Sequence, residues 1–262
     1  QSRGIIWNEF KKRFTHNHQK PNHNKVKRIA LIPARKGSNR IKDKNIRLLN
    51  GLPLIAYSII AAKKSKLFDK IFVITDSKRY LDIGKKYGAD LFKLRPSKIS
   101  TSESPDISWL LWFAKNYKNF SKLQYISILR PTSPFRTAKT IKRAHTEFIR
   151  NINDVDSLRA ISKTEVHPAK MWIDHGKIMS PLIPFYNEKG IPWHSNQSNT
   201  LPKVYFQNAS LEITKPETIL KQKSLSGNRI MSFHSQKHEG LDINNELDFN
   251  FAEYLINLKK LK

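Results

Sequence analysis

The chain has no cysteine among its 262 residues. This absence excludes disulfide bonds, thiolate nucleophiles and zinc sites built on cysteine. Residues 1–25 are polar and basic and lack the apolar core of a secretory signal. Both features favour a reducing compartment, and we expect a cytoplasmic protein.

Long apolar runs are also missing. A membrane-spanning helix needs roughly 18 apolar residues, and the longest apolar cluster, residues 54–62, is short and interrupted. We therefore expect no membrane partner. The hydrophobic fraction of 39% still allows a buried core. The length predicts one domain over residues 26–262 with a small extra lobe, preceded by a flexible basic extension over residues 1–25.

Acidic residues are scarce. The chain has 21 Asp and Glu against 48 Lys and Arg, for a net charge of +27. Such an excess fits a nucleic-acid partner, an anionic small substrate or a lysine-rich genome. The basic residues are spread from Lys11 to Lys262 and accompany no recognised nucleic-acid motif. This argues against nucleic acid as the main partner.

Short runs of β character alternate with amphipathic stretches along most of the chain. This alternation predicts βαβ units and a mostly parallel sheet. The predicted strands are residues 28–32, 71–74, 91–94, 125–129 and 157–161, and the predicted helices are residues 54–66, 78–87, a helix capped by Ser104, and 137–150.

The pattern breaks over residues 165–201, which contain four prolines. We interpret this segment as an inserted arm outside the sheet. Regular structure is expected again at residues 204–213 and 229–233, with a final helix over residues 245–259.

The loop that follows the first predicted strand carries the strongest chemical signal. It contains Gly37 and Ser38 among the cations Arg35, Lys36, Arg40 and Lys44. Ligands of open α/β sheets bind beyond the carboxyl ends of the strands. Backbone N–H groups of such a loop can face phosphates, and its fixed positive charges suit a triphosphate.

Seven motifs in the same order resemble those of acylneuraminate cytidylyltransferases, the CMP-sialic acid synthetases. They are Ala-Arg-Lys-Gly-Ser at 34–38 with Lys-Asn at 44–45, Phe-Val-Ile-Thr-Asp at 72–76, Leu-Arg-Pro at 94–96, Leu-Arg-Pro-Thr-Ser-Pro-Phe-Arg at 129–136, His-Pro-Ala-Lys-Met-Trp at 167–172, Gln-Asn-Ala-Ser-Leu at 207–211 and the run at 240–248. The resemblance covers about residues 27–258.

The resemblance implies a three-layer, Rossmann-like α/β nucleotidyltransferase domain that transfers CMP from CTP to a nine-carbon acidic sugar. It also implies a twofold homodimer in which the arm docks into the second subunit. Mg²⁺ is the implied cofactor, since a lone carboxylate at a predicted strand end, that of Asp242, suits this oxygen-seeking ion.

Roles for individual residues follow from the same resemblance. The implied catalytic residues are Arg35, Lys44 and Asp242; the nucleotide-binding residues are Ala34, Arg35, Gly37, Ser38, Lys44, Asn45 and Arg95; the sugar-binding residues are Arg130, Ser133, Lys170, Gln207 and Asn208; and the metal ligands are Asp242 and Asn244. Structural roles stay open for several of them: Arg35 could pair with a carboxylate, Lys44 could be solvated, Asn208 could satisfy backbone groups, Lys170 could lie along Trp172, and Asp242 could help start the last helix.

Three positions depart from the family pattern. Asn244 stands where a second acid is common, Arg130 stands where sialic acid enzymes often have Gln, and residues 198–200 lack an Arg-Gln pair. These changes fall on the expected sugar side. They leave legionaminate, pseudaminate or a 3-deoxy-octulosonate open as the sugar, and also a catalytically weak homologue with a binding or regulatory role.

Overall fold

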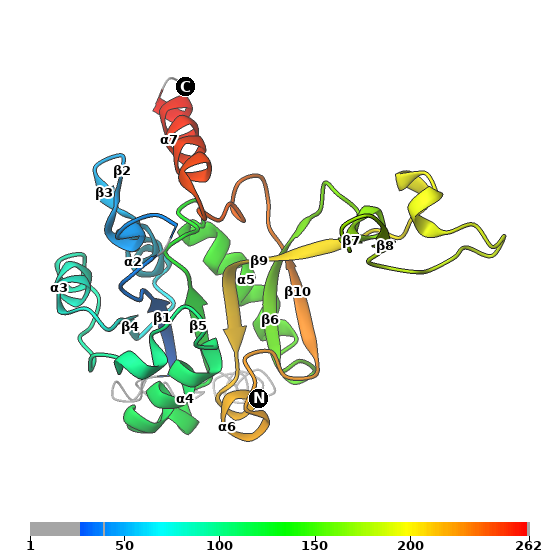
Figure 1. The fold of residues 1–262 in the computed structure, drawn as a ribbon. Coiled ribbons are helices and arrows are strands. Elements are labelled where there is room, and N and C mark those ends of the chain that lie inside the picture. Colours follow the sequence, from blue (N-terminus) through cyan, green and yellow to red (C-terminus); the bar gives the residue numbers. More distant parts are fainter. Residues whose placement is uncertain (1–26, 39, 261–262) are drawn as a thin grey trace, which may run out of the picture.

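The computed structural model describes residues 27–38 and 40–260, and its central element is a six-stranded sheet (Figure 1). The strand order is β10-β6-β9-β5-β1-β4, and β9 is antiparallel to both of its neighbours. The strands are β1 (Arg28–Pro33), β4 (Lys70–Ile74), β5 (Tyr125–Leu129), β6 (Ser157–Lys163), β9 (Tyr205–Thr214) and β10 (Ile230–His234). The expected extension, residues 1–25, lies outside the described residues.

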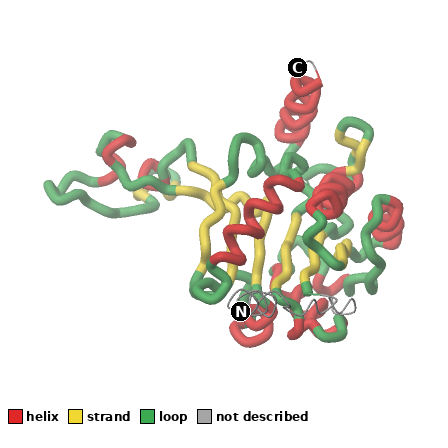
Figure 2. Tube along the Cα trace, turned by 180° about the vertical axis from the view of Figure 1, so that it is seen from behind, coloured by secondary structure: helices red, strands yellow, loops and turns green. Residues whose placement is uncertain are grey.

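Helices cover both faces of this sheet, which confirms the predicted three-layer α/β fold. The helices α2 (Leu54–Ser65), α3 (Lys78–Lys86) and α5 (Ala138–Arg150) pack on one face, and α4 (Asp106–Asn116) and α6 (Pro216–Gln222) pack on the other. In Figure 2 the first face is turned toward the viewer. Side chains alternate along β1, so that Ala30 and Ile32 join the first core while Ile29 and Leu31 join the second.

Two details differ from the sequence prediction. Residues 91–94 form no strand. The preceding residue, Asp90, makes an isolated β-bridge to Phe72 that does not extend into them. Phe92 instead turns its ring into a cluster with Phe72 and Phe113. Ser104 does not cap α4: the helix begins at Asp106, Pro105 occupies the cap position, and the Ser104 hydroxyl bonds to Thr101. The short helix α6 was not predicted.

The segment predicted as an arm leaves the sheet after β6 and returns at β9 (Figure 1). It contains a small hairpin of β7 (Trp172–Asp174) and β8 (Met179–Pro181) and three single 3-10 turns. It protrudes from the body, and many of its large apolar side chains are exposed.

The last helix, α7 (Glu246–Lys260), packs on a hairpin of β2 (Leu48–Leu49) and β3 (Leu52–Pro53). Ile243, Phe249 and Ala252 form a third core there with Leu54. This contact brings residues 240–246 beside the loop that follows β1. No helix of the described chain is both long and apolar enough to cross a membrane.

The two-sided core predicts very different responses to the same truncation. Leu110 of α4 is fully buried, whereas Leu247 of α7 is 78% exposed. Leu110→Ala should lower the free energy of unfolding by about 2–5 kcal/mol, and Leu247→Ala should change it by less than about 0.5 kcal/mol. Urea denaturation measures both, and equal losses would contradict the placement of α4 against the sheet.

Candidate functional site

A cavity of about 670 Å³ opens at the carboxyl ends of β1 and β5. This is the edge where ligands bind in open α/β sheets. The cavity brings together six predicted site residues: Arg35, Ser38, Lys44, Asn45, Arg95 and Arg130. They come from three separate loops of the chain, so only the fold makes them neighbours.

The loop after β1 is shaped by its own backbone contacts. Ala34 is buried and donates its N–H to the carbonyl of Ile74, 3.0 Å away. Gly37 has a φ of +78°, which favours glycine, and its carbonyl accepts a 2.7 Å bond from the Arg35 guanidinium. The side-chain amide of Asn45 donates a 3.1 Å hydrogen bond to the carbonyl of Arg35 and so holds the loop. The loop therefore presents Arg35 and Ser38 to the cavity in a fixed conformation.

Two buried cations border this cavity. Lys44 is 9% exposed and its Nζ donates to the carbonyl of Ile243 at 2.7 Å. Arg95 is 5% exposed and its Nε donates to the hydroxyl of Ser100 at 2.8 Å. Neither takes part in any of the ion pairs formed within the described residues.

Burial lowers the pKa of both groups, although nearby carboxylates act in the opposite direction. A buried charge is costly unless it is paired. An anion that enters the cavity would supply that pairing for Lys44 and Arg95 together.

Arg130 lies at the other end of the cavity and is already paired. Its guanidinium contacts Asp106, at the start of α4, and Glu212 of β9 at 3.4 Å. Burial alone would raise the pKa of the Asp106 carboxyl, but Arg130 and the indole N–H of Trp109 lower it overall. The sequence analysis missed Asp106 and Glu212. The sequence carries no local signal for them, because both carboxylates are distant from Arg130 along the chain.

Arg136 organises the turn that carries Arg130 and Ser133. Its guanidinium is 1% exposed and donates to the carbonyls of Arg130 and Ser210 and to the hydroxyl of Ser58. The carbonyl of Ser133 accepts the N–H of Arg136, whereas its buried Oγ has no hydrogen-bond partner among the described residues. Ser133 does not line the cavity wall.

Asp242 lies in the loop between β10 and α7, not at a strand end as the sequence analysis assumed. β10 ends at His234 and α7 begins at Glu246, so Asp242 belongs to neither element. Asp242 and Asn244 do not line the cavity, but their loop lies beside it, since Lys44, which lines the cavity, donates a 2.7 Å bond to the carbonyl of Ile243.

Asn244 is not the cap of the last helix. Asn245 accepts the N–H of Asp248, so Asn245 has that role. The Asn244 amide donates to Oδ2 of Asp242 at 2.8 Å, and its oxygen accepts from Arg40 at 3.2 Å. Oδ1 of Asp242 is buried and has no hydrogen-bond partner within the described chain.

Besides Ser133, three predicted sugar contacts lie outside the cavity. Gln207 is exposed on β9. Asn208 is 4% exposed, and its amide bonds to Ser162, Ser235 and the N–H of Ser210. Lys170 lies in the arm and donates to the carbonyls of His194 and Asn196. Their roles toward a sugar stay predictions.

The family is decided by a model described as "Cytidylyltransferase", which matches residues 29–225. The chain belongs to the cytidylyltransferase family. It is therefore a nucleotidyltransferase, and the predicted family resemblance is confirmed.

Several named proteins are similar in sequence to this cytidylyltransferase. Post-translational flagellin modification protein B of Campylobacter coli is 31% identical over 89% of this chain and 97% of that protein. CMP-N,N'-diacetyllegionaminic acid synthase of Legionella pneumophila is 30% identical over 88% and 97%. N-acylneuraminate cytidylyltransferase of Streptococcus agalactiae is 31% identical over 90% of this chain, which spans about half (56%) of that protein.

A solved structure supports the fold of the cytidylyltransferase. It is the CMP:2-keto-3-deoxy-manno-octonic acid synthetase complexed with CTP, which superposes with a TM-score of 0.64 at 11% identity. The match covers 89% of this chain and 99% of that one.

The pKa of Lys44 provides a test of the cavity as an anion site. Its value in the free cytidylyltransferase lies below the ordinary 10.5, and a bound polyanion favours the charged form and raises it. Binding therefore takes up a proton, so affinity for inorganic tripolyphosphate should fall as pH rises through the lowered pKa, by up to about tenfold per pH unit.

Calorimetry across the alkaline range measures this dependence. The control is Lys44→Arg. The arginine guanidinium stays protonated throughout this range, so the substitution should remove most of the pH dependence of binding. An unchanged pH dependence in Lys44→Arg would show that Lys44 does not face the anion.

Proposed function

We propose that this chain transfers CMP from CTP to a nonulosonic acid of the sialic type, giving the CMP-sugar and pyrophosphate. The observation that carries the proposal is that two buried cations, Lys44 and Arg95, form no ion pair within the described chain and lie beside the basic loop of a cytidylyltransferase. A triphosphate would supply the negatively charged partner that these two cations lack. Relatives named for acylneuraminate and legionaminate support the sugar class.

The reaction requires positioning more than covalent chemistry. The oxygen of the anomeric hydroxyl bonds to the α-phosphorus of CTP, the bond from that phosphorus to the β-phosphate oxygen breaks, and the hydroxyl proton passes to water. Arg35, Ser38 and Lys44 hold the phosphates and neutralise the leaving pyrophosphate. Asn45 and Arg95 hold the nucleotide side.

The residues present fit a magnesium ion. Asp242 offers Oδ1, which is buried and has no hydrogen-bond partner among the described residues, and no group of three or more His, Cys, Asp or Glu in the described chain competes as a metal site. Mg²⁺ accepts one or two carboxylates and completes its shell with phosphates and water. When bound, it would neutralise phosphate charge and favour ionisation of the attacking hydroxyl.

Asn244 would contribute little to that ion as it lies here. Its N–H₂ group faces Asp242, and its oxygen accepts from Arg40. We propose Asp242 as the main metal ligand, with Asn244 orienting its carboxylate.

Arg130 marks the sugar end of the cavity. Its charge is balanced by Asp106 and Glu212, so the group can donate hydrogen bonds to a sugar without demanding a further anion. Sugar-binding roles stay proposed for Ser133, Gln207 and Asn208 as well.

A homodimer would explain the position of Lys170, which lies in the arm and not in the cavity of its own chain. The arm exposes Trp172, Ile173, Met179, Phe185 and Tyr186, and large apolar side chains exposed together on one segment are typical of an interaction site. We propose that the arm docks on a second copy. A cytoplasmic setting is proposed as well, supported by the absence of cysteine.

The test of the function is a panel of sugar acids with CTP and Mg²⁺, read by pyrophosphate release and mass spectrometry. N-acetylneuraminate, legionaminate, pseudaminate and a 3-deoxy-octulosonate make up the panel. At least one should yield its CMP-sugar, and CTP should raise the Tm more than ATP or GTP. Absence of product with every acid would instead support a weak homologue with a binding role.

The matched variants are Arg35→Ala and Arg150→Ala, the second on the exposed end of α5. Arg35→Ala should lower turnover on the order of a hundredfold while the protein stays folded, and Arg150→Ala should not. Near-normal turnover in Arg35→Ala would remove that residue from the site.

The dimer proposal predicts a change of oligomeric state. Charges placed on the arm, as in the double variant Ile173→Glu with Phe185→Glu, should convert a dimer to a monomer, because a buried contact cannot accept unpaired carboxylates. Light scattering measures the mass, and Leu247→Glu on α7 is the control. A double variant that remains dimeric would place the interface elsewhere.

A further inference from the structure

The loop that carries Asp242, residues 235–245, contains no helix or strand. A side chain on such a segment is held in place only by the contacts that its neighbours make. Some of these contacts come from residues that line the cavity, such as Lys44 and Thr132, and others come from parts of the chain outside it.

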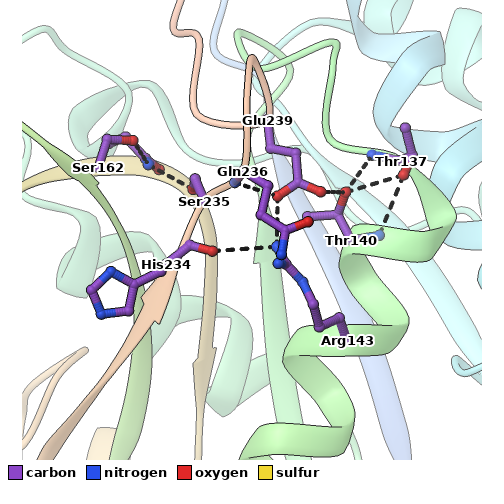
Figure 3. Close-up of polar contacts among 9 residues, drawn as sticks. Thr137, Thr140, Arg143, Ser162, His234, Ser235, Gln236 and Glu239 are labelled. Carbon is purple, nitrogen blue, oxygen red and sulfur yellow. Dashed lines mark hydrogen bonds and ion pairs between the residues drawn. The ribbon is translucent and has the colours of Figure 1, made fainter.

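Glu239 ties this loop to helix α5 (Figure 3). One carboxylate oxygen accepts from Thr140 Oγ1 at 2.6 Å. The other accepts from Arg143 at 2.6 Å and from the N–H of Gln236 at 2.8 Å. Both oxygens are therefore used, and the side chain is only 18% exposed.

The partners of Glu239 are themselves fixed. Arg143 also donates to the carbonyl of His234, the last residue of β10, at 3.3 Å, and its guanidinium lies 4.4 Å from the centre of the Phe233 ring. Thr140 belongs to the capping box of α5 with Thr137. Glu239 thus connects its loop to both a helix and a strand, as the dashed contacts of Figure 3 show.

Asn208 supports the loop from the opposite side. Its amide donates to Ser162 at 2.7 Å and to Ser235 at 2.8 Å. Ala209, the residue that follows it, has a φ of +55° within the irregular stretch of β9. A Cβ at Gly240 would lie 2.7 Å from Ser162 Oγ and closer still to the Asn208 amide, so only glycine fits there.

The far side of Asp242 is fixed as well. Ile243 donates its N–H to the carbonyl of Thr132 at 2.9 Å and accepts from Lys44 Nζ at 2.7 Å. Asp242 therefore lies between Gly240, which packs closely against Asn208 and Ser162, and Ile243, whose N–H and carbonyl are both hydrogen-bonded. These contacts limit the positions that the free oxygen of Asp242 can take.

We propose that Glu239 is a positioning residue for the metal site, acting through Arg143 and Thr140 to fix the loop that presents Asp242. The proposal rests on the proposed role of Asp242 as metal ligand. Partners that orient a metal ligand typically change metal affinity by 10- to 100-fold when removed.

The experiment measures Mn²⁺ binding in the presence of CTP, by the loss of the free Mn²⁺ signal in electron paramagnetic resonance. This readout requires no turnover. Glu239→Ala should weaken Mn²⁺ binding by about tenfold or more and raise the Mg²⁺ concentration for half-maximal rate by the same factor. The affinity of the Glu239→Ala variant for CTP in the absence of metal should stay unchanged. Glu239→Gln, which keeps an acceptor for Thr140, should show a smaller loss in the same direction.

The control is Lys70→Met, which removes a 2.7 Å ion pair with Asp90 at the far edge of the sheet. It should leave Mn²⁺ binding unchanged. If Asp242→Asn abolishes binding while both Glu239 variants bind as wild type, Glu239 only joins α5 to the loop and this proposal is overturned. If Asp242→Asn also binds as wild type, the metal assignment in the proposed function fails, and the positioning role fails with it.

Discussion

The site depends on two cations that the fold buries without an ion pair among the described residues. Lys44 and Arg95 lose most of their contact with water and receive in exchange a carbonyl and a hydroxyl. Such groups shift toward their neutral form, and the pKa of each is lowered. The core on both faces of the sheet supplies the stability that keeps these two cations buried. A bound polyphosphate would offset the cost of burying them unpaired. An anion bound at the carboxyl edge of β1 would therefore pair with both groups.

The second requirement is rigidity in segments without regular structure. Three irregular segments meet at or beside the cavity: the loop after β1, the turn after β5 and the loop before α7. The first is held by Asn45, which lines the cavity, and the other two are held by polar side chains outside it. Asn208 and Glu239 support the last loop, and Arg136 supports the turn after β5. The arrangement follows the general rule that a functional group needs a second layer of partners to stay within reach of its target.

Much of this could be predicted from the sequence, for physical reasons. A helix over residues 54–66 was predicted because Ile55, Ser58 and Ala62 recur on one face; the structure has α2 over Leu54–Ser65, and all three side chains are buried. The loop at 34–45 was predicted because its charges follow a strand. Residues 91–94 were mispredicted, since short apolar runs do not distinguish a strand from a loop that packs one aromatic ring. Asp106, Glu212 and Glu239 were missed because their partners, Arg130 and Arg143, are distant in sequence, and only the fold brings them together.

The most direct measurement of the central claim is a crystal structure of the chain with CTP and Mg²⁺. The account predicts a triphosphate that contacts Arg35, Lys44 and Arg95, with an oxygen of Asp242 bound to the ion. Lys44 and Arg95 would then both have an anionic partner. A triphosphate bound elsewhere, for example on the lysines exposed along α5, with the cavity at the carboxyl edge left empty, would contradict it.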